Sequence, residues 1–231
     1  TDWQPAGAPN NGLTLRQMWG FSFASLQGSG SFQLEQIQLL TITTIAALPT
    51  PTAAASPTPA TRELLIDNFE LGGAASWSLF MDANSAISAQ MISPGEAGQF
   101  ALGVDGIVAA NGWAGAQKIF GSPQDWTGYN NFDFWFYGTN SGSPLRLEIL
   151  DNRAAGSTTD TSERFAFLFS DNFLGWRHFI LPWSVFARRT DWQPAGAPND
   201  GFGRNQVWGF NFSIISGTDR FQVDEIRLTS P

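Results

Sequence analysis

Short stretches of alternating apolar and polar residues recur along the chain from Leu64 onward, separated by Gly, Asn, Asp, Ser and Pro. No segment keeps the helical period of about 3.6 residues over a window of about 11. The pattern therefore predicts β-strands. They are expected at residues 64–69, 76–80, 86–91, 99–104, 114–120, 132–137, 145–150, 164–169, 177–181, 206–214 and 220–228. Many short strands over roughly 165 residues favour an all-β fold, a β-sandwich of the jelly-roll type.

Alternation also divides the side chains of three central strands between two faces. The Phe residues of 132–137 and 164–169 and the aliphatic residues of 145–150 point one way, which predicts the core. The polar and remaining aromatic residues point the other way. We expect one outer sheet face that carries Asp133, Trp135, Tyr137, Arg146, Glu148 and Arg164.

A face of this composition has two interpretations. A sugar offers an apolar C–H face to a flat aromatic ring and hydroxyls to charged groups, whose hydrogen bonds contribute about 1.5–3 kcal/mol each. The same residues could instead form a solvated sheet face with cross-strand ion pairs worth roughly 0.2–1 kcal/mol each. Spacing alone does not choose between the two.

A repeat organises the chain. Residues 1–39 align without a gap onto residues 190–228 with 21 identities in 39 positions, and the first ten residues of the two copies are identical. We interpret residues 1–41 as the C-terminal fragment of a preceding module and residues 62–231 as a complete module. About 40 residues rarely bury enough core to fold alone, so the fragment is expected to pack on a partner. The repeated loop around Trp192 indicates either packing or a ligand contact.

Residues 42–61 between the two parts are rich in Pro, Thr and Ala. Such a segment favours extended polyproline II and serves as a semi-rigid linker. Linkers of this kind are common between modules of secreted polysaccharide-active proteins. The expected location is therefore extracellular or on the cell surface.

Composition narrows the classes of partner. The chain has a net charge of −8, so phosphate backbones and anionic lipid surfaces are poor partners, and we expect no nucleic acid and no membrane. Ten Trp residues are more than a core of this size needs, so some should lie at the surface. With no cysteine, disulfides and thiolate metal sites are excluded.

Catalysis is not expected. His178 is the single histidine, and no nucleophile elbow, phosphate-binding loop or zinc-ligand spacing occurs. No catalytic residue is therefore assigned.

Several segments of the second part carry a resemblance to a known family. They are Leu65–Glu70, Asp125–Asn130, Leu145–Glu148, Gly175–Arg177, Leu181–Phe186, Asp191–Pro194, Val207–Phe210 and Phe221–Leu228. Residues 64–228 resemble the family 11 carbohydrate-binding modules and related galactose-binding-like jelly rolls. The resemblance implies a concave sheet face that holds a linear β-glucan, typically one with mixed β-1,3-1,4 linkages.

The family uses tyrosine platforms together with an Arg and Asp pair. Arg146 and Glu148 fall on the matching strand and Asp133 on its neighbour, with Glu where Asp is usual. Only Tyr129 and Tyr137 are present, so Trp residues such as Trp135 would have to provide stacking.

The resemblance also implies a structural Ca²⁺ near the chain ends. Calcium prefers six to eight oxygen ligands. The candidate ligands are Asp67, Glu70 and Asp224, which could equally be ordinary strand-end carboxylates.

The leading functional hypothesis is a non-catalytic polysaccharide-binding module, for a β-glucan, within a secreted or cell-surface multimodular protein. The alternative is a structural repeat of an extracellular filament, sheath or surface layer, which self-associates through the N-terminal half-module. A third, weaker hypothesis is an assembly module that resembles a chaperone. Binding to a soluble glucan separates the first hypothesis from the other two.

Overall fold

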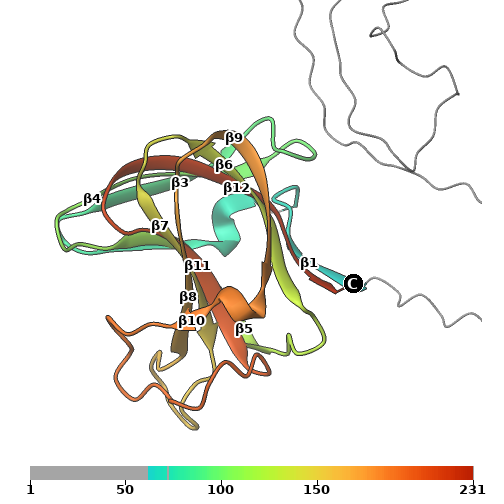
Figure 1. Ribbon diagram of the computed structural model, residues 1–231, viewed down its shortest axis with the longest axis vertical. Helices are drawn as coiled ribbons and strands as arrows, with labels where there is room; N and C mark the ends of the chain where they lie inside the picture. Colours follow the sequence, from blue (N-terminus) through green and yellow to red (C-terminus); the bar gives the residue numbers. More distant parts are fainter. Residues whose placement is uncertain (1–61, 72, 231) are drawn as a thin grey trace, which may run out of the picture. The chain divides into compact units, whose positions relative to one another are not determined.

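The computed structural model describes residues 62–71 and 73–230, which belong to one compact unit spanning Ser56–Pro231. In this part of the chain, twelve β-strands form two antiparallel sheets that enclose one hydrophobic core (Figure 1). The described helices are the single-turn 3-10 segments η2 (Gly73–Ser76) and η3 (Trp183–Val185). No helix among the described residues is long and apolar enough to cross a membrane.

The first sheet, called the β6 sheet, has the strand order β3-β4-β12-β6-β9. Its strands are β3 (Ala86–Ile92), β4 (Ala101–Val108), β12 (Gly217–Ser230), β6 (Asn131–Thr139) and β9 (Leu174–Pro182). The long strand β12 pairs with β4 over its first half and with β6 over its second. β1 (Arg62–Asp67) also pairs with the end of β12, which ties the start of the module to its end.

The second sheet, called the β7 sheet, has the strand order β10-β8-β7-β11-β5-β2. Its strands are β10 (Ala187–Arg188), β8 (Glu163–Ser170), β7 (Pro144–Asp151), β11 (Val207–Ile214), β5 (Ala114–Gln124) and β2 (Ser78–Met81). Consecutive strands β6 and β7 therefore lie in different sheets, joined by the loop of residues 140–143.

Aromatic side chains join the two sheets. Phe132 and Phe134 of β6 meet Phe210 and Phe212 of β11, with ring centroids 5.1 Å apart in both the Phe132–Phe210 and the Phe134–Phe212 pair. All four side chains are at most 2% exposed. Both pairs are edge-to-face, a geometry that adds about 0.5–1.5 kcal/mol to the burial of apolar area. These contacts fix how the sheets stack.

A bulge in β11 sets the register of the β7 sheet. The pairing of β11 with both β5 and β7 shifts between Val207 and Gly209. A Cβ atom at Gly209 would lie 2.4 Å from the carbonyl oxygen of Lys118, so only glycine allows the strands to approach this closely. Beyond the bulge, Asn211 pairs with Glu148.

Every strand expected from alternation is present, with boundaries shifted by a few residues, and the β-sandwich is confirmed. The structure adds β10, whose two residues are too few to show alternation. The expected module fragment at residues 1–41 and the linker at residues 42–61 lie outside the described residues.

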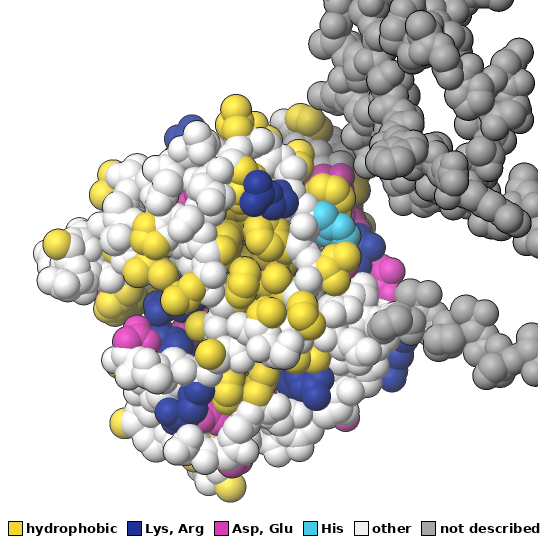
Figure 2. All heavy atoms as spheres, in the orientation of Figure 1, with side chains coloured by type: hydrophobic (Ala, Val, Ile, Leu, Met, Phe, Trp, Pro, Cys, Tyr) yellow, Lys and Arg dark blue, Asp and Glu magenta, His cyan; other side chains and the backbone are white. Residues whose placement is uncertain are grey.

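The surface is not uniformly polar. On the face seen in Figure 2, hydrophobic side chains gather across the middle of the module, and Lys and Arg side chains stand around them. Trp113 and Trp192 are 48% and 50% exposed. Half of each indole ring therefore remains available for contact at the surface.

We expect Phe210→Ala to lower the free energy of unfolding by about 3–5 kcal/mol, because it empties the contact between the sheets. Urea unfolding followed by Trp fluorescence measures the change. Leu174→Ala is the control: this side chain is 76% exposed, so its loss should change stability by less than about 0.5 kcal/mol. Equal effects of the two substitutions would contradict the assigned core.

Candidate functional site

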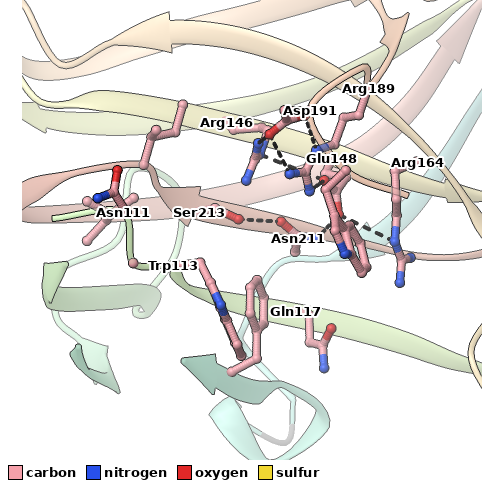
Figure 3. Close-up of a pocket in the computed structure, with 15 residues that line it drawn as sticks. Asn111, Trp113, Gln117, Arg146, Glu148, Arg164, Arg189, Asp191, Asn211 and Ser213 are labelled. Carbon is pink, nitrogen blue, oxygen red and sulfur yellow. Dashed lines mark hydrogen bonds and ion pairs between the residues drawn. The ribbon is translucent and has the colours of Figure 1, made fainter. Parts of the chain in front are cut away.

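A cleft of about 520 Å³ opens on the outer face of the β7 sheet. Its floor comes from β5, β7, β8 and β11, and its two ends from the loops before β5 and after β10 (Figure 3). The lining residues are Phe80, Asn111, Gly112, Trp113, Gln117, Arg146, Glu148, Arg164, Arg189, Asp191, Trp192, Asn211, Ser213, Ile214 and Ile215.

Glu148 is the centre of the polar floor. Its side chain is almost fully buried, and it accepts hydrogen bonds from Arg189 Nη1 at 2.7 Å and from Asn211 Nδ2 at 3.0 Å. The Nε atoms of Arg146 and Arg164 lie 3.7 and 3.6 Å from its carboxylate oxygens. Ser213 in turn donates to Asn211 Oδ1 at 2.6 Å. Side chains from adjacent strands thus fix one another's positions in the floor of the cleft.

Arg189 and Asp191 extend this network up one side of the cleft. Arg189 donates to Asp191 through Nε at 3.0 Å and Nη2 at 2.7 Å, a bidentate pair (Figure 3). The hydrogen bonds from Arg189, helped by the nearby charge of Arg146, lower the pKa of Asp191 to about 2. Asp191 is therefore ionised throughout the ordinary pH range.

The amide of Gln193 anchors the loop that carries this side. Its Oε1 accepts from the backbone N–H of Arg164 at 2.9 Å. Its Nε2 donates to the carbonyl oxygens of Arg164 and Arg189, both at 3.0 Å. The loop after β10 is thereby fastened to strand β8, which positions Trp192.

Aromatic residues stand at the two ends of the cleft. Trp113 stacks on Phe80 with ring centroids 6.1 Å apart and an interplanar angle of 26°. Trp192 lies over the guanidinium groups of Arg189 and Arg164, at 5.3 and 5.9 Å from the ring centroid. Trp113 precedes β5 and Trp192 follows β10, so the two come from opposite ends of the sheet.

Some guanidinium donors in the floor are near Glu148 but make no hydrogen bond to it. Within the described part of the chain, Arg146 Nε and Arg164 Nε and Nη1 are buried and make no hydrogen bond. Buried polar groups are ordinarily satisfied, so their presence together in one cleft indicates a site that is completed by a ligand or by water.

Comparison with known proteins agrees with this arrangement. The family model described as a carbohydrate binding domain (family 11) matches residues 51–230. The chain belongs to family 11 of the carbohydrate-binding modules. No curated protein matches it.

Two solved structures illustrate the relation. One is a family 11 module from Clostridium thermocellum in complex with a β-1,3-1,4-mixed-linked tetrasaccharide; it is 22% identical, with a TM-score of 0.65 and coverage of 72% of this chain and 94% of that one. The other is the family 11 module of a cellulosomal cellulase of Clostridium thermocellum; it is 21% identical, with a TM-score of 0.64 and the same coverage. At this identity, the two structures support the β-sandwich fold.

The cleft contains three of the six carbohydrate-binding residues expected from the sequence. Arg146, Glu148 and Arg164 lie together in its floor. Asp133, Trp135 and Tyr137 do not: they are on β6, in the opposite sheet. The expectation of one shared face was wrong, because alternation shows which side of its own strand a residue occupies but not to which sheet the strand belongs.

The three displaced residues contact β9 instead. Trp135 stacks on His178 with centroids 4.6 Å apart, and Tyr137 meets Trp176 edge-on at 5.4 Å. Asp133 is 2.8 Å from His178 Nε2. These are pairs between neighbouring strands of the β6 sheet.

Sequence reasoning left Trp113, Arg189, Asp191, Trp192 and Asn211 out of the predicted site. The available signal was the identical repetition of residues 1–10 at 190–199, which includes Asp191 and Trp192. Whether that repetition reflected packing or a ligand could not be decided without seeing where the loop lies.

Each candidate calcium ligand has partners within the protein. Asp67 pairs with Lys118 Nζ at 2.7 Å, whereas Glu70 accepts from the backbone N–H groups of Gln99 and Phe100 at 2.8 and 2.7 Å. Asp224 accepts from the loop of residues 95–100 through the N–H groups of Glu96 and Ala97. Among the described residues, no group of three or more Asp, Glu or His side chains converges as a metal site.

Calcium binding at Asp67, Glu70 and Asp224 stays a prediction. It is tested by the thermal unfolding midpoint of the full chain in EDTA and in CaCl₂. A rise with CaCl₂ that is lost in Asp224→Asn would support it, since a site in the folded state stabilises by mass action. Identical midpoints in the two buffers would contradict it.

Removal of the Glu148 carboxylate should destabilise the folded module. We expect Glu148→Ala to lower the free energy of unfolding by about 3 kcal/mol or more, because it leaves buried guanidinium groups without their counterion. Chemical denaturation gives the value. Glu63→Ala is the matched control: Glu63 pairs with Arg227 at an exposed position, and its loss should cost less than about 0.5 kcal/mol. A tolerated Glu148→Ala would show that the floor network contributes little to stability.

Proposed function

We propose that this chain is a polysaccharide-binding module that holds a linear β-glucan in the cleft of the β7 sheet. The observation that carries the proposal is the combination of a half-exposed Trp at each end of the cleft with a rigid polar floor between them. A flat indole packs against the C–H face of a sugar ring, and the floor offers donors and acceptors to its hydroxyls.

The charge balance of the cleft favours an uncharged ligand. Arg146, Arg164 and Arg189 are matched by three carboxylates. These are Glu148, Asp160 and Asp191. Because the network is close to neutral, it provides many hydrogen bonds without a net charge that would need a charged ligand. A neutral glucan meets this requirement.

The length of the cleft favours a chain over a single sugar. It crosses the sheet from the β2 and β5 side to the β10 side, with its aromatic residues at the two limits. A family 11 relative was solved with a β-1,3-1,4-mixed-linked tetrasaccharide, and this supports the same type of glucan as the ligand here.

The function proposed is non-catalytic, in keeping with a carbohydrate-binding domain of family 11. We further propose an extracellular or cell-surface location, because a long polysaccharide is met outside the cell and because residues 42–61 have the composition of a linker between secreted modules.

We expect Trp113→Ala and Trp192→Ala each to weaken glucan binding about 10-fold or more, since each removes one stacking surface. Affinity electrophoresis of the full chain in gels containing barley β-glucan, laminarin, xylan or no polysaccharide measures this. Retardation should be strongest in barley β-glucan.

Trp135→Ala is the matched control, because it removes an indole from the outer face of the other sheet. It should bind like the unaltered chain. Retardation lost in Trp135→Ala but kept in Trp113→Ala and Trp192→Ala would move the site to the β6 sheet. No retardation by any glycan, together with polymerisation that grows with protein concentration, would favour the structural-repeat hypothesis instead.

A further inference from the structure

The acceptor groups of the cleft floor are already engaged within the protein. Each carboxylate oxygen of Glu148 accepts a hydrogen bond, one from Asn211 and the other from Arg189. Both oxygens of Asp191 accept from Arg189, and the side-chain carbonyl oxygen of Asn211 accepts from Ser213. A sugar hydroxyl is a donor as well as an acceptor, so a glycan in this cleft gains most from an acceptor that has no partner yet.

The amide of Gln117 is such a group. Gln117 belongs to β5, lines the cleft and is half-buried. Among the residues that the structure describes, its side chain makes no hydrogen bond, and no dashed line reaches it in Figure 3. An amide carries a carbonyl acceptor and two N–H donors. It can therefore accept from one hydroxyl of a ligand and donate to the next.

Strand pairing aligns Gln117 with the polar centre of the floor. It lies opposite Asn211 in the pairing of β5 with β11, and Asn211 lies opposite Glu148 in the pairing of β11 with β7. The three side chains thus form a row across three neighbouring strands, with about 4.8 Å between one strand and the next. A residue on a paired strand holds its position more precisely than one on a loop.

An aromatic surface lies beside this row on the same face of β5. Gly115, two residues before Gln117, is opposite Phe80 in the pairing of β2 with β5. A Cβ atom at Gly115 would lie 2.5 Å from Phe80 Cζ, so the Phe80 ring fills the space above this glycine. Trp113 stacks on Phe80. The backbone beneath the Phe80 ring is thus about 7 Å along the strand from Gln117.

We propose that Gln117 is a specificity-determining residue of the cleft, whose amide binds two adjacent hydroxyl groups of a sugar ring that stacks on Phe80 and Trp113. The carbonyl oxygen accepts from one hydroxyl, and an N–H group donates to its neighbour. This inference rests on the proposed function, because it names a group that recognises the glucan in the same cleft.

The linkage of a glucan decides whether a glucosyl unit offers such a pair. A unit that is linked through its C4 hydroxyl keeps free hydroxyls on C2 and C3, which are adjacent. A unit that is linked through its C3 hydroxyl keeps those on C2 and C4, which are not adjacent. A site built to bind a hydroxyl group disfavours a ligand that lacks it. Gln117 therefore selects a 4-linked unit at the Trp113 end of the cleft.

The test replaces Gln117 with methionine, which keeps the length of the side chain and removes the amide. Because the amide has no partner among the described residues, Gln117→Met should move the thermal unfolding midpoint by less than about 2 °C. In affinity electrophoresis of the full chain, binding to barley β-glucan should weaken about 10-fold. Retardation in laminarin, a 3-linked glucan, should be the same for the variant and the unaltered chain.

Gln90→Met is the matched control, because Gln90 is exposed on β3 in the other sheet. It should bind barley β-glucan like the unaltered chain. Should Gln117→Met destabilise the module, Gln117→Glu takes its place. Glutamate keeps the acceptor and loses the donors, so binding to barley β-glucan should weaken by about 3-fold, with no change in laminarin.

The outcomes separate this inference from the proposed function. Unchanged binding in the Gln117 variants, with binding lost in Trp113→Ala and Trp192→Ala, would overturn the role of Gln117 and leave the cleft as the glucan site. A loss of equal size in laminarin and barley β-glucan would overturn the selection of a 4-linked unit. An unaltered chain that no glycan retards would contradict the proposed function, and this inference with it.

Discussion

The burial of one aromatic layer between two sheets is the constraint on which this module depends. Each strand places Phe, Leu or Ile on the side that faces the other sheet, and the rings of β6 and β11 meet edge-on across the interface. Because the layer is closely packed, the strands cannot shift by one residue without exposing their apolar side chains. The polar residues of the same strands are therefore directed to the two outer faces, and one of those faces becomes the cleft.

Ion pairs and hydrogen bonds, rather than apolar packing, hold the side chains of the cleft floor in place. Glu148 is held by strand neighbours and by arginines from two further segments, and Asp191 completes the pairing at the surface. A network of this kind holds its donors at set positions before a ligand arrives, which reduces the conformational entropy lost on binding. The two Trp residues add apolar surface at the ends of the cleft.

Carboxylates elsewhere in the module hold loops rather than ligands. Asp151 accepts from the N–H groups of Gly203 and Arg204, Asp224 from the loop of residues 95–100, and Asp171 from the loop between β6 and β7. Buried backbone N–H groups need an acceptor, and in these loops the carboxylate takes the place of the carbonyl oxygen that a paired strand would offer. This use of acidic side chains is consistent with an acidic chain whose binding site is nonetheless close to neutral.

The strands, the sandwich and the core can be predicted from the sequence alone, because period-two alternation is a local property that each strand shows independently. It also placed Arg146, Glu148 and Arg164 on the outer side of their strands. The assignment of β6 and β7 to different sheets becomes visible only in the folded molecule, since the four residues between them could form a hairpin or cross from one sheet to the other. That choice separated Trp135 from Glu148 and brought Trp113 and Trp192, far apart in the chain, to the same cleft.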